Sequence, residues 1–229
     1  MNQARDLSRP IFIINFKNYS EILGEPALRL ARSAELVASM LDVEVMVAPP
    51  VPSLASIASS VRIPVIGQKV EDAVEGKSTG AVIPEALRAW GCAGSLINHS
   101  ESKATLDTIA KLIPRMKQSG MLSCVCAEST EELTRIAPLA PEFLAVEPPE
   151  LIGTGISVSK ARPELISLSV AAAESAGYRG QVLCGAGIVS AEDVRAATKL
   201  GARGILVASS VVKSKDWEAK IRELASALR

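Results

Sequence analysis

Short apolar runs alternate with amphipathic segments along the whole chain, and this pattern limits the possible folds more than any other feature. Segments with apolar residues at three- and four-residue spacing, such as 27–37 and 106–116, are typical of helices that bury one face. Eight units of strand followed by helix predict a parallel β-sheet. The apolar runs span residues 11–16, 43–48, 63–67, 94–98, 121–126, 143–147, 181–184 and 204–208.

The predicted strands are apolar almost throughout, which indicates a sheet that is buried on both faces. An open, doubly wound sheet and a closed barrel both satisfy this condition. The number of units, together with a length of 229 residues that contains no linker or low-complexity tract, favours the closed form. We therefore predict an α/β fold in which residues 1–229 form a single (β/α)8 barrel domain.

The charge balance argues against several classes of partner. The chain has 25 basic and 25 acidic residues, so it lacks the positive charge with which proteins bind nucleic acid or anionic membranes. No apolar stretch approaches the roughly 20 residues that cross a bilayer, and the N-terminal residues lack the apolar core of an export signal. We expect a small-molecule partner and a cytoplasmic location.

The cysteines do not form a recognisable metal or disulfide motif. Cys92, Cys124, Cys126 and Cys184 include no Cys-x-x-Cys pair, and only one histidine could complete a zinc site. We predict reduced thiols and no metal. Cys124 and Cys126 alternate on one predicted strand, so we expect both to pack on the same face.

Three ionisable residues stand at the ends of predicted strands, on the side of a barrel where chemistry normally occurs. Lys17 follows the first strand, the only histidine, His99, follows the fourth, and Glu147 is the last residue of the sixth. A carboxylate can take a proton from carbon, an imidazole can move protons between adjacent oxygens, and an ammonium can neutralise charge on an oxygen. Together they suit proton transfer next to a carbonyl group.

Each of these residues also has an ordinary structural interpretation. A single histidine is often a hydrogen-bonded structural residue, a loop lysine is commonly solvated, and a carboxylate often forms an ion pair or caps a helix. Their occurrence together at the ends of three strands favours the catalytic interpretation.

Small residues at the same end of the barrel predict a phosphate site. Backbone N–H groups after the seventh and eighth strands form the usual phosphate site of such barrels, and Gly185-Ala186-Gly187 and Ala208-Ser209-Ser210 stand at these places. The sixth strand leads into residues 148–155, whose prolines and glycines predict a lid. We expect the lid to bring Gly153, with Ile152 beside it, to the ligand.

The chain resembles the triosephosphate isomerase family, and in particular its compact archaeal branch. The resemblance runs from Ile14 to Asp216 and therefore covers most of the chain. The motifs that carry it are Asn15-Phe16-Lys17, Asn98-His99-Ser100-Glu101, residues 146–155, Val158-Ser159-Lys160-Ala161, residues 183–188 and residues 206–209.

The resemblance implies a TIM barrel that interconverts dihydroxyacetone phosphate and D-glyceraldehyde 3-phosphate through an enediol(ate), a step of glycolysis and gluconeogenesis, without a cofactor. It implies that Glu147 is the general base and that His99 is a neutral imidazole that polarises the carbonyl. Lys17, with Asn15 beside it, would supply positive charge. The resemblance also implies a homo-oligomer, a tetramer or a dimer, in which residues 68–80 insert beside a neighbour's active site.

Three positions depart from the family pattern. Ser210 replaces a usual glycine, Ser102-Lys103 stand where an arginine usually follows the histidine motif, and residues 76–80 replace a form that often reads His-Thr-Gly, keeping Thr79. If the backbone at Ser210 needs a positive φ, serine would be strained there by about 1 kcal/mol and phosphate binding would weaken. If serine fits, its hydroxyl can add a hydrogen bond to phosphate.

Residues from Ser100 onward are expected to begin a short helical turn whose positive end keeps His99 neutral.

Two other functions agree with parts of the pattern. One is a different phosphosugar isomerase or epimerase, which would share the phosphate loops without needing Lys17, His99 and Glu147 together. The other is a barrel that binds phosphate without turnover.

Overall fold

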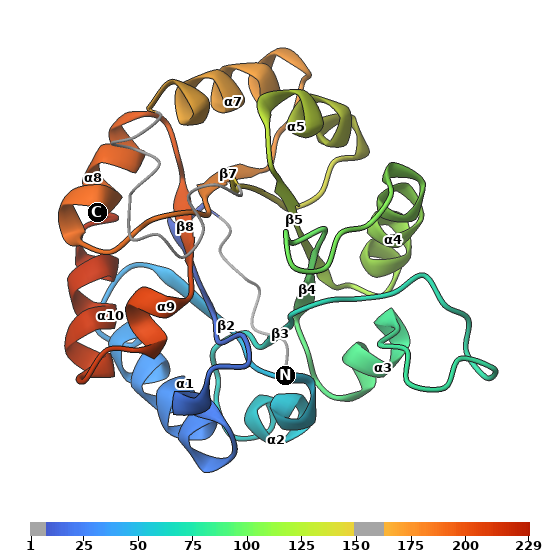
Figure 1. Ribbon diagram of the computed structural model, residues 1–229, viewed down its shortest axis with the longest axis horizontal. Helices are drawn as coiled ribbons and strands as arrows, with labels where there is room; N and C mark the ends of the chain where they lie inside the picture. The colour runs from blue at the N-terminus through green and yellow to red at the C-terminus, as the bar shows by residue number, and fades with distance from the viewer. Residues whose placement is uncertain (1–7, 149–162) are drawn as a thin grey trace.

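The computed structural model describes residues 8–148 and 163–229, and it confirms the (β/α)8 barrel. Figure 1 shows the strands inside a ring of helices. The parallel strands form one sheet in the order β2-β1-β8-β7-β6-β5-β4-β3, and an isolated bridge between Val47 and Val65 links its two end strands. The strands are β1 Ile11–Asn15, β2 Glu44–Ala48, β3 Ile66–Gly67, β4 Gly94–Ile97, β5 Leu122–Ala127, β6 Phe143–Val146, β7 Gln181–Cys184 and β8 Gly204–Val207.

Helices of the described ranges cover the outside of the barrel, where α10 packs against α1 and α5 packs against α7 (Figure 1). Short 3-10 helices span Ser20–Ile22, Val51–Ser53 and Ala137–Leu139. The α-helices are α1 Glu25–Ala38, α2 Leu54–Ala58, α3 Pro84–Ala89, α4 Leu106–Gln118, α5 Thr130–Ile136, α7 Pro163–Ser175, α8 Ala191–Lys199, α9 Ser209–Val212 and α10 Trp217–Ser226.

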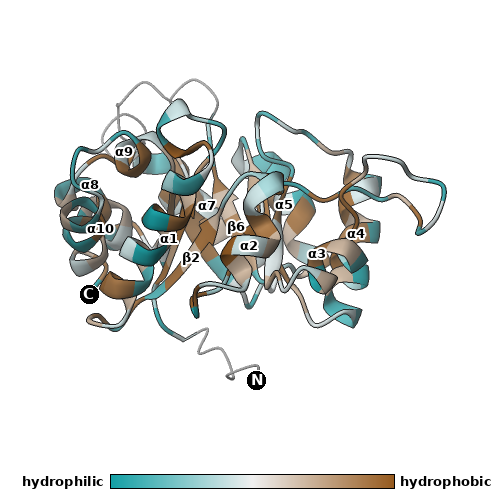
Figure 2. Cartoon of the chain, turned by 90° about the horizontal axis from the view of Figure 1, so that it is seen from below, coloured by the Kyte–Doolittle hydropathy of each residue, from teal (hydrophilic) through white to brown (hydrophobic). Residues whose placement is uncertain are grey.

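Side chains alternate between the barrel interior and the surrounding helices along each strand, as the pleat of a strand requires. On β1, Ile11 and Ile13 fill the interior, whereas Phe12 and Ile14 belong to the larger core beneath the helices. Figure 2 shows the hydrophobic residues gathered on the strands and the hydrophilic ones on the outer faces of the helices. This alternation decides which residues just beyond a strand can reach the interior.

The strands agree closely with the predicted runs, and β3 is the exception. Seven of the runs begin and end within one residue of a strand, but the run at 63–67 yields only Ile66–Gly67. Pro64 has no N–H to donate to a neighbouring strand, so regular pairing cannot start before it. The edge that closes the barrel is therefore short.

The four cysteines are free thiols and all are buried. Cys124 and Cys126 both belong to the interior cluster of the barrel, which confirms that they share one face of β5. Among the helices of the described residues, none is long and apolar enough to cross a membrane.

Candidate active site

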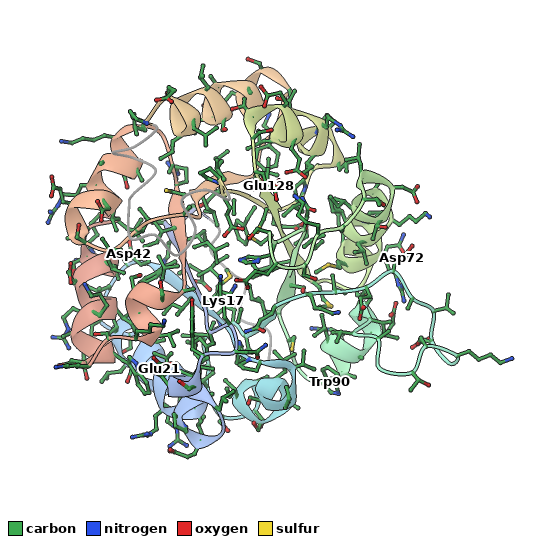
Figure 3. All side chains as sticks on the ribbon, viewed as in Figure 1. Lys17, Glu21, Asp42, Asp72, Trp90 and Glu128 are labelled. Carbon is green, nitrogen blue, oxygen red and sulfur yellow. The ribbon has the colours of Figure 1, made fainter. Side chains whose placement is uncertain are left out.

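Most of the predicted site residues line one cavity at the C-terminal ends of the strands. Lys17, one of its lining residues, lies inside the ring of helices in Figure 3. Strands β1, β4, β6, β7 and β8 all lead into the cavity. Its lining consists of Asn15, Lys17, Tyr19, His99, Glu147, residues 185–189 and residues 206–210.

Glu147 follows β6 at an interior position, two residues after Ala145, and its backbone N–H donates to the Ala127 carbonyl at 2.8 Å. The residue is only 3% exposed. Burial raises the pKa of Glu147 to about 7, against the opposing influence of the Cys126 thiol and the Lys17 charge. Its Oε2 atom accepts no hydrogen bond from the described residues. A carboxyl group in this state can exchange a proton near neutral pH.

Gly185, the first residue after β7, provides the space that the Glu147 side chain occupies. A Cβ atom at Gly185 would lie 2.3 Å from Cγ of Glu147, which is far inside van der Waals contact. The two residues follow Cys184 and Val146, which pair in the sheet. Gly185 was predicted only as part of the phosphate site, so its role beside Glu147 was missed.

His99 is 5% exposed, and its two ring nitrogens have different partners. Nδ1 accepts the backbone N–H of Glu101 at 3.1 Å, so in the neutral ring the proton lies on Nε2. Nε2 lies 3.7 Å from Oε1 of Glu147. Burial lowers the pKa of His99 to about 4, and the positive charge of Lys17 acts in the same direction. The imidazole is therefore a neutral donor that faces the carboxyl group.

The predicted turn from Ser100 onward is present only as one hydrogen-bonded turn, and no helix begins there. Residues 100–101 form a turn in which the Ser102 N–H donates to the His99 carbonyl at 2.7 Å, and helix α4 begins only at Leu106. The side chain of Asn98 accepts the Ala104 N–H at 3.0 Å and so holds this segment as a loop. His99 is kept neutral by burial and not by a helix terminus.

We expect the ring of His99 to remain neutral throughout the neutral pH range, because burial disfavours its charged form. The chain has one histidine, so ¹⁵N NMR of the ring can be read without assignment. The signals should show the Nε2–H tautomer and should not titrate until the pH approaches 4. A titration midpoint near the ordinary value of about 6.5 would contradict this expectation.

Lys17 has a left-handed backbone conformation, with φ 49°, which is uncommon for a residue other than glycine. The side chain of Asn15 accepts its N–H at 3.0 Å, and Gln68 Nε2 donates to its carbonyl at 3.0 Å. Its Nζ atom pairs with Glu101 at 2.8 Å. These contacts fix an ammonium at the cavity. Glu101 and Gln68 were not predicted to contact Lys17.

The residues after β7 and β8 line the same cavity. Ala208 is the N-cap of α9, so the N–H groups of Ser209 and Ser210 lie in its first turn and have no acceptor within the helix. Gly187 has φ 70°, a conformation that glycine adopts without strain. Exposed N–H groups of this kind bind anions.

The structure favours the second alternative at Ser210, in which serine fits the backbone without strain. Ser210 is the second residue of helix α9 and is not among the residues with positive φ. Its hydroxyl oxygen is buried and has no hydrogen-bond partner among the described residues. The serine therefore fits the backbone and leaves a polar atom available at the cavity.

Sequence reasoning also missed Tyr19, which lines the cavity two residues after Lys17. The Lys213 ammonium, just after α9, lies 4.6 Å from the centre of the Tyr19 ring. A cation over an aromatic ring is attracted to it, so this pair connects the segment after β1 to that after β8. Ile152 and Gly153, with the predicted lid, lie outside the described residues.

Taken together, the arrangement can transfer a proton to and from carbon. A buried carboxyl group, a neutral N–H donor and an ammonium meet at one cavity that also has backbone N–H groups for an anion. Across residues 8–148 and 163–229, no group of three or more His, Cys, Asp or Glu side chains could hold a metal ion.

The chain is similar to known proteins along most of its length. Residues 10–224 match the family model for triosephosphate isomerase. A triosephosphate isomerase from Methanothermus fervidus is 43% identical over 218 residues, which cover 95% of this chain and 98% of that protein. One from Methanocaldococcus jannaschii is 44% identical over 93% of this chain and 98% of its own length. One from Cenarchaeum symbiosum is 44% identical over 96% and 98%, respectively.

Proposed function

The chain belongs to the triosephosphate isomerase family, and on this premise we propose that it interconverts dihydroxyacetone phosphate and D-glyceraldehyde 3-phosphate with Glu147, His99 and Lys17 as its catalytic residues. The observation that carries the assignment is the convergence of the three side chains on one cavity. Glu147 and His99 are buried and face each other at 3.7 Å, and Lys17 lines the same space.

In the proposed reaction, the Glu147 carboxylate takes a proton from the carbon next to the substrate carbonyl. The Nε2–H of His99 donates to the carbonyl oxygen, and the Lys17 ammonium stabilises the negative charge that develops on oxygen. Glu147 then returns its proton to the neighbouring carbon, while His99 moves a proton between the two oxygens. The substrate is neither oxidised nor reduced, and both residues end in their starting states.

A coupled assay tests the proposal. Purified protein is given D-glyceraldehyde 3-phosphate, and the dihydroxyacetone phosphate that forms is reduced with NADH by an added dehydrogenase. We expect turnover that far exceeds the uncatalysed rate. If triose phosphate is not converted but pentose phosphates are, the protein is another phosphosugar isomerase or epimerase. If phosphate ligands bind without turnover of either, the non-catalytic alternative is correct.

The phosphate group of the substrate is proposed to bind the N–H groups of residues 185–187 and 208–210, together with Ile152 and Gly153. The first turn of α9 offers N–H donors to an anion, and the Ser210 hydroxyl lies buried at the same cavity with no partner in the described part of the chain. In this proposal, Ser210 compensates for the usual glycine by adding a hydrogen bond of its own.

We expect Ser210→Ala to raise KM about tenfold with kcat nearly unchanged, since a hydrogen bond to a charged group typically contributes about 1.5–3 kcal/mol and this one exists in both ground and transition states. Steady-state kinetics and competition by inorganic phosphate measure the effect. Ser226→Ala, at an exposed position on α10, is the matched control. An unchanged KM in Ser210→Ala would show that the hydroxyl does not bind phosphate.

A homo-oligomer, either a tetramer or a dimer, is also proposed. The segment between β3 and α3 forms a loop that projects beyond the ring of helices in Figure 1, and Val74 within it is 70% exposed. A second hollow beside the catalytic cavity is lined by Lys17, His99 and the Val51-Pro52 pair. In the proposed assembly, residues 68–80 of a neighbouring copy fill this hollow and steady the catalytic side chains.

If this assembly is correct, activity per subunit should fall when the protein is diluted below its dissociation range, because the hollow is then empty. Thr79→Arg should cause the same loss at higher concentration by blocking the inserted segment. Light scattering gives the state of assembly at each concentration, and an assay on the same samples gives the activity. A fully active monomer would contradict the proposal.

The cytoplasm is the proposed location of the reaction. All four cysteines are free and buried. Reduced thiols are typical of the cytosol, whereas exported proteins commonly form disulfides.

A further inference from the structure

The orientation of His99 does not follow from the alternation of β4. On that strand, Leu96 packs in the barrel interior and Ile97 packs beneath the helices. Unbroken alternation would point Asn98 inward and His99 outward. His99 nevertheless lines the catalytic cavity, and Asn98 between them has a left-handed backbone with φ 62°. The alternation of side chains is therefore broken at Asn98.

The side chain of Asn98 is held by three hydrogen bonds and is 2% exposed. Its Nδ2 group donates to the Cys126 carbonyl at 2.8 Å and to Glu132 Oε1 at 2.9 Å, and its Oδ1 atom accepts the Ala104 N–H at 3.0 Å. These bonds tie the end of β4 to the end of β5, to helix α5 and to the segment before α4. Asn98 is not among the residues that line the catalytic cavity.

Glu132, in the first turn of α5, is itself fixed by several donors. Its carboxylate accepts the Glu128 N–H at 2.8 Å and the Lys103 ammonium at 3.0 Å, in addition to Asn98. Burial would raise the pKa of Glu132, but the hydrogen bonds from Glu128, Asn98 and Lys103 lower it below its ordinary value. Lys103 stands after the histidine motif, and its Nζ atom also lies 3.3 Å from Oε1 of Glu128. Glu128 lies inside the ring of helices in Figure 3.

We propose that Asn98 and Glu132 are positioning residues that orient His99. Glu132 fixes the side chain of Asn98, Asn98 fixes the left-handed backbone, and this backbone directs the imidazole into the cavity. Asparagine suits this place because it tolerates the left-handed region better than most residues and because its side chain both donates and accepts. The effect on turnover rests on the proposed role of His99, but the orientation of the ring can be measured without substrate.

The test compares Asn98→Ala, Asn98→Gly and Glu132→Ala with a control, Glu128→Ala. Like Glu132, the Glu128 carboxylate pairs with Lys103, but it accepts no hydrogen bond from the Asn98 side chain. We expect kcat to fall about 100-fold in Asn98→Ala, because small misplacements of a catalytic group can cost this much, and severalfold in Glu132→Ala. Asn98→Gly should retain more activity than Asn98→Ala, since glycine adopts a positive φ without strain. KM should change less than twofold in each variant.

The signals of the single histidine provide the second readout. In Asn98→Ala and Glu132→Ala, the ¹⁵N shifts and the titration midpoint of the ring should move from those of the parent protein, whereas in Glu128→Ala they should not. Unchanged histidine signals in both variants would overturn the proposal, whatever happens to kcat. If Asn98→Ala does not fold, Asn98→Gly and Glu132→Ala give the same comparison. His99→Gln is assayed separately. If it leaves turnover intact while the histidine signals of Asn98→Ala and Glu132→Ala still move, the role of His99 in the reaction fails but the positioning stands.

Discussion

Glu147→Gln should reduce kcat by about 10²- to 10⁴-fold, the usual contribution of a general acid or base, because an amide cannot accept a proton from carbon. Glutamine has nearly the same shape, so binding of inorganic phosphate, measured by calorimetry, should hardly change. Steady-state assays on both proteins give the ratio of kcat values. A variant that keeps its activity within about tenfold of the parent would remove Glu147 from the role of base.

The same substitution has a separate effect on stability, and it depends on pH. Burial raises the pKa of Glu147 from 4.5 to about 7, so the folded protein holds this proton over a range in which the unfolded chain has lost it. The favourable contribution is complete below the unfolded pKa and is lost as the pH rises through the folded pKa. Glutamine has no proton to lose. As the pH rises from 4.5 to 8, the free energy of unfolding of Glu147→Gln should therefore increase by about 3 kcal/mol relative to that of the parent.

Urea unfolding at a series of pH values measures this gain. The difference in the free energy of unfolding between variant and parent should grow with pH and level off above about 7. A difference that is flat with pH would mean that the carboxyl group titrates normally in the folded protein. This outcome would also remove the physical reason for its strength as a base.

Gly185→Ala should lower kcat about 100-fold although it alters no ionisable group, because misplacing a catalytic group by about 1 Å can cost this much. The new Cβ atom would lie 2.3 Å from Cγ of Glu147, so the carboxylate must leave its place beside His99. Assays of kcat with purified variant measure the loss. Thermal unfolding shows whether the barrel remains folded.

A double-mutant comparison distinguishes displacement of Glu147 from a general effect of Gly185→Ala. If the alanine acts by moving the carboxylate, adding Gly185→Ala to Glu147→Gln should lower kcat little further, because the base is already lost. If the two losses multiply, the glycine acts by another route, such as its position beside the phosphate site.

The strands, and the residues at their C-terminal ends, could be predicted from the sequence because they depend on local periodicity. Lys17, His99 and Glu147 all stand at the ends of apolar runs, and the closed parallel sheet brings such positions to one end. The role of Gly185 depends on the register between β6 and β7, which periodicity within one strand does not contain. The conformation of Asn98 depends on side-chain bonds to Ala104, Cys126 and Glu132, and that of Ser210 on the start of α9 at Ser209, so strand patterns could not predict them.

β7 and β8 share a single residue pair, Cys184 with Ile205, and the pairing between β2 and β3 is equally short and gives the barrel a weak joint. Only the bridge between Val47 and Val65 connects β2 and β3, whereas β1 pairs with β2 along five residues. Segments with few backbone hydrogen bonds open more easily than the rest of a protein. In the strand order of the ring, β6 and β7 lie farthest from this joint. An opening confined to the joint between β2 and β3 would leave Glu147 and Gly185 seated together, so it need not interrupt the placement of the carboxylate.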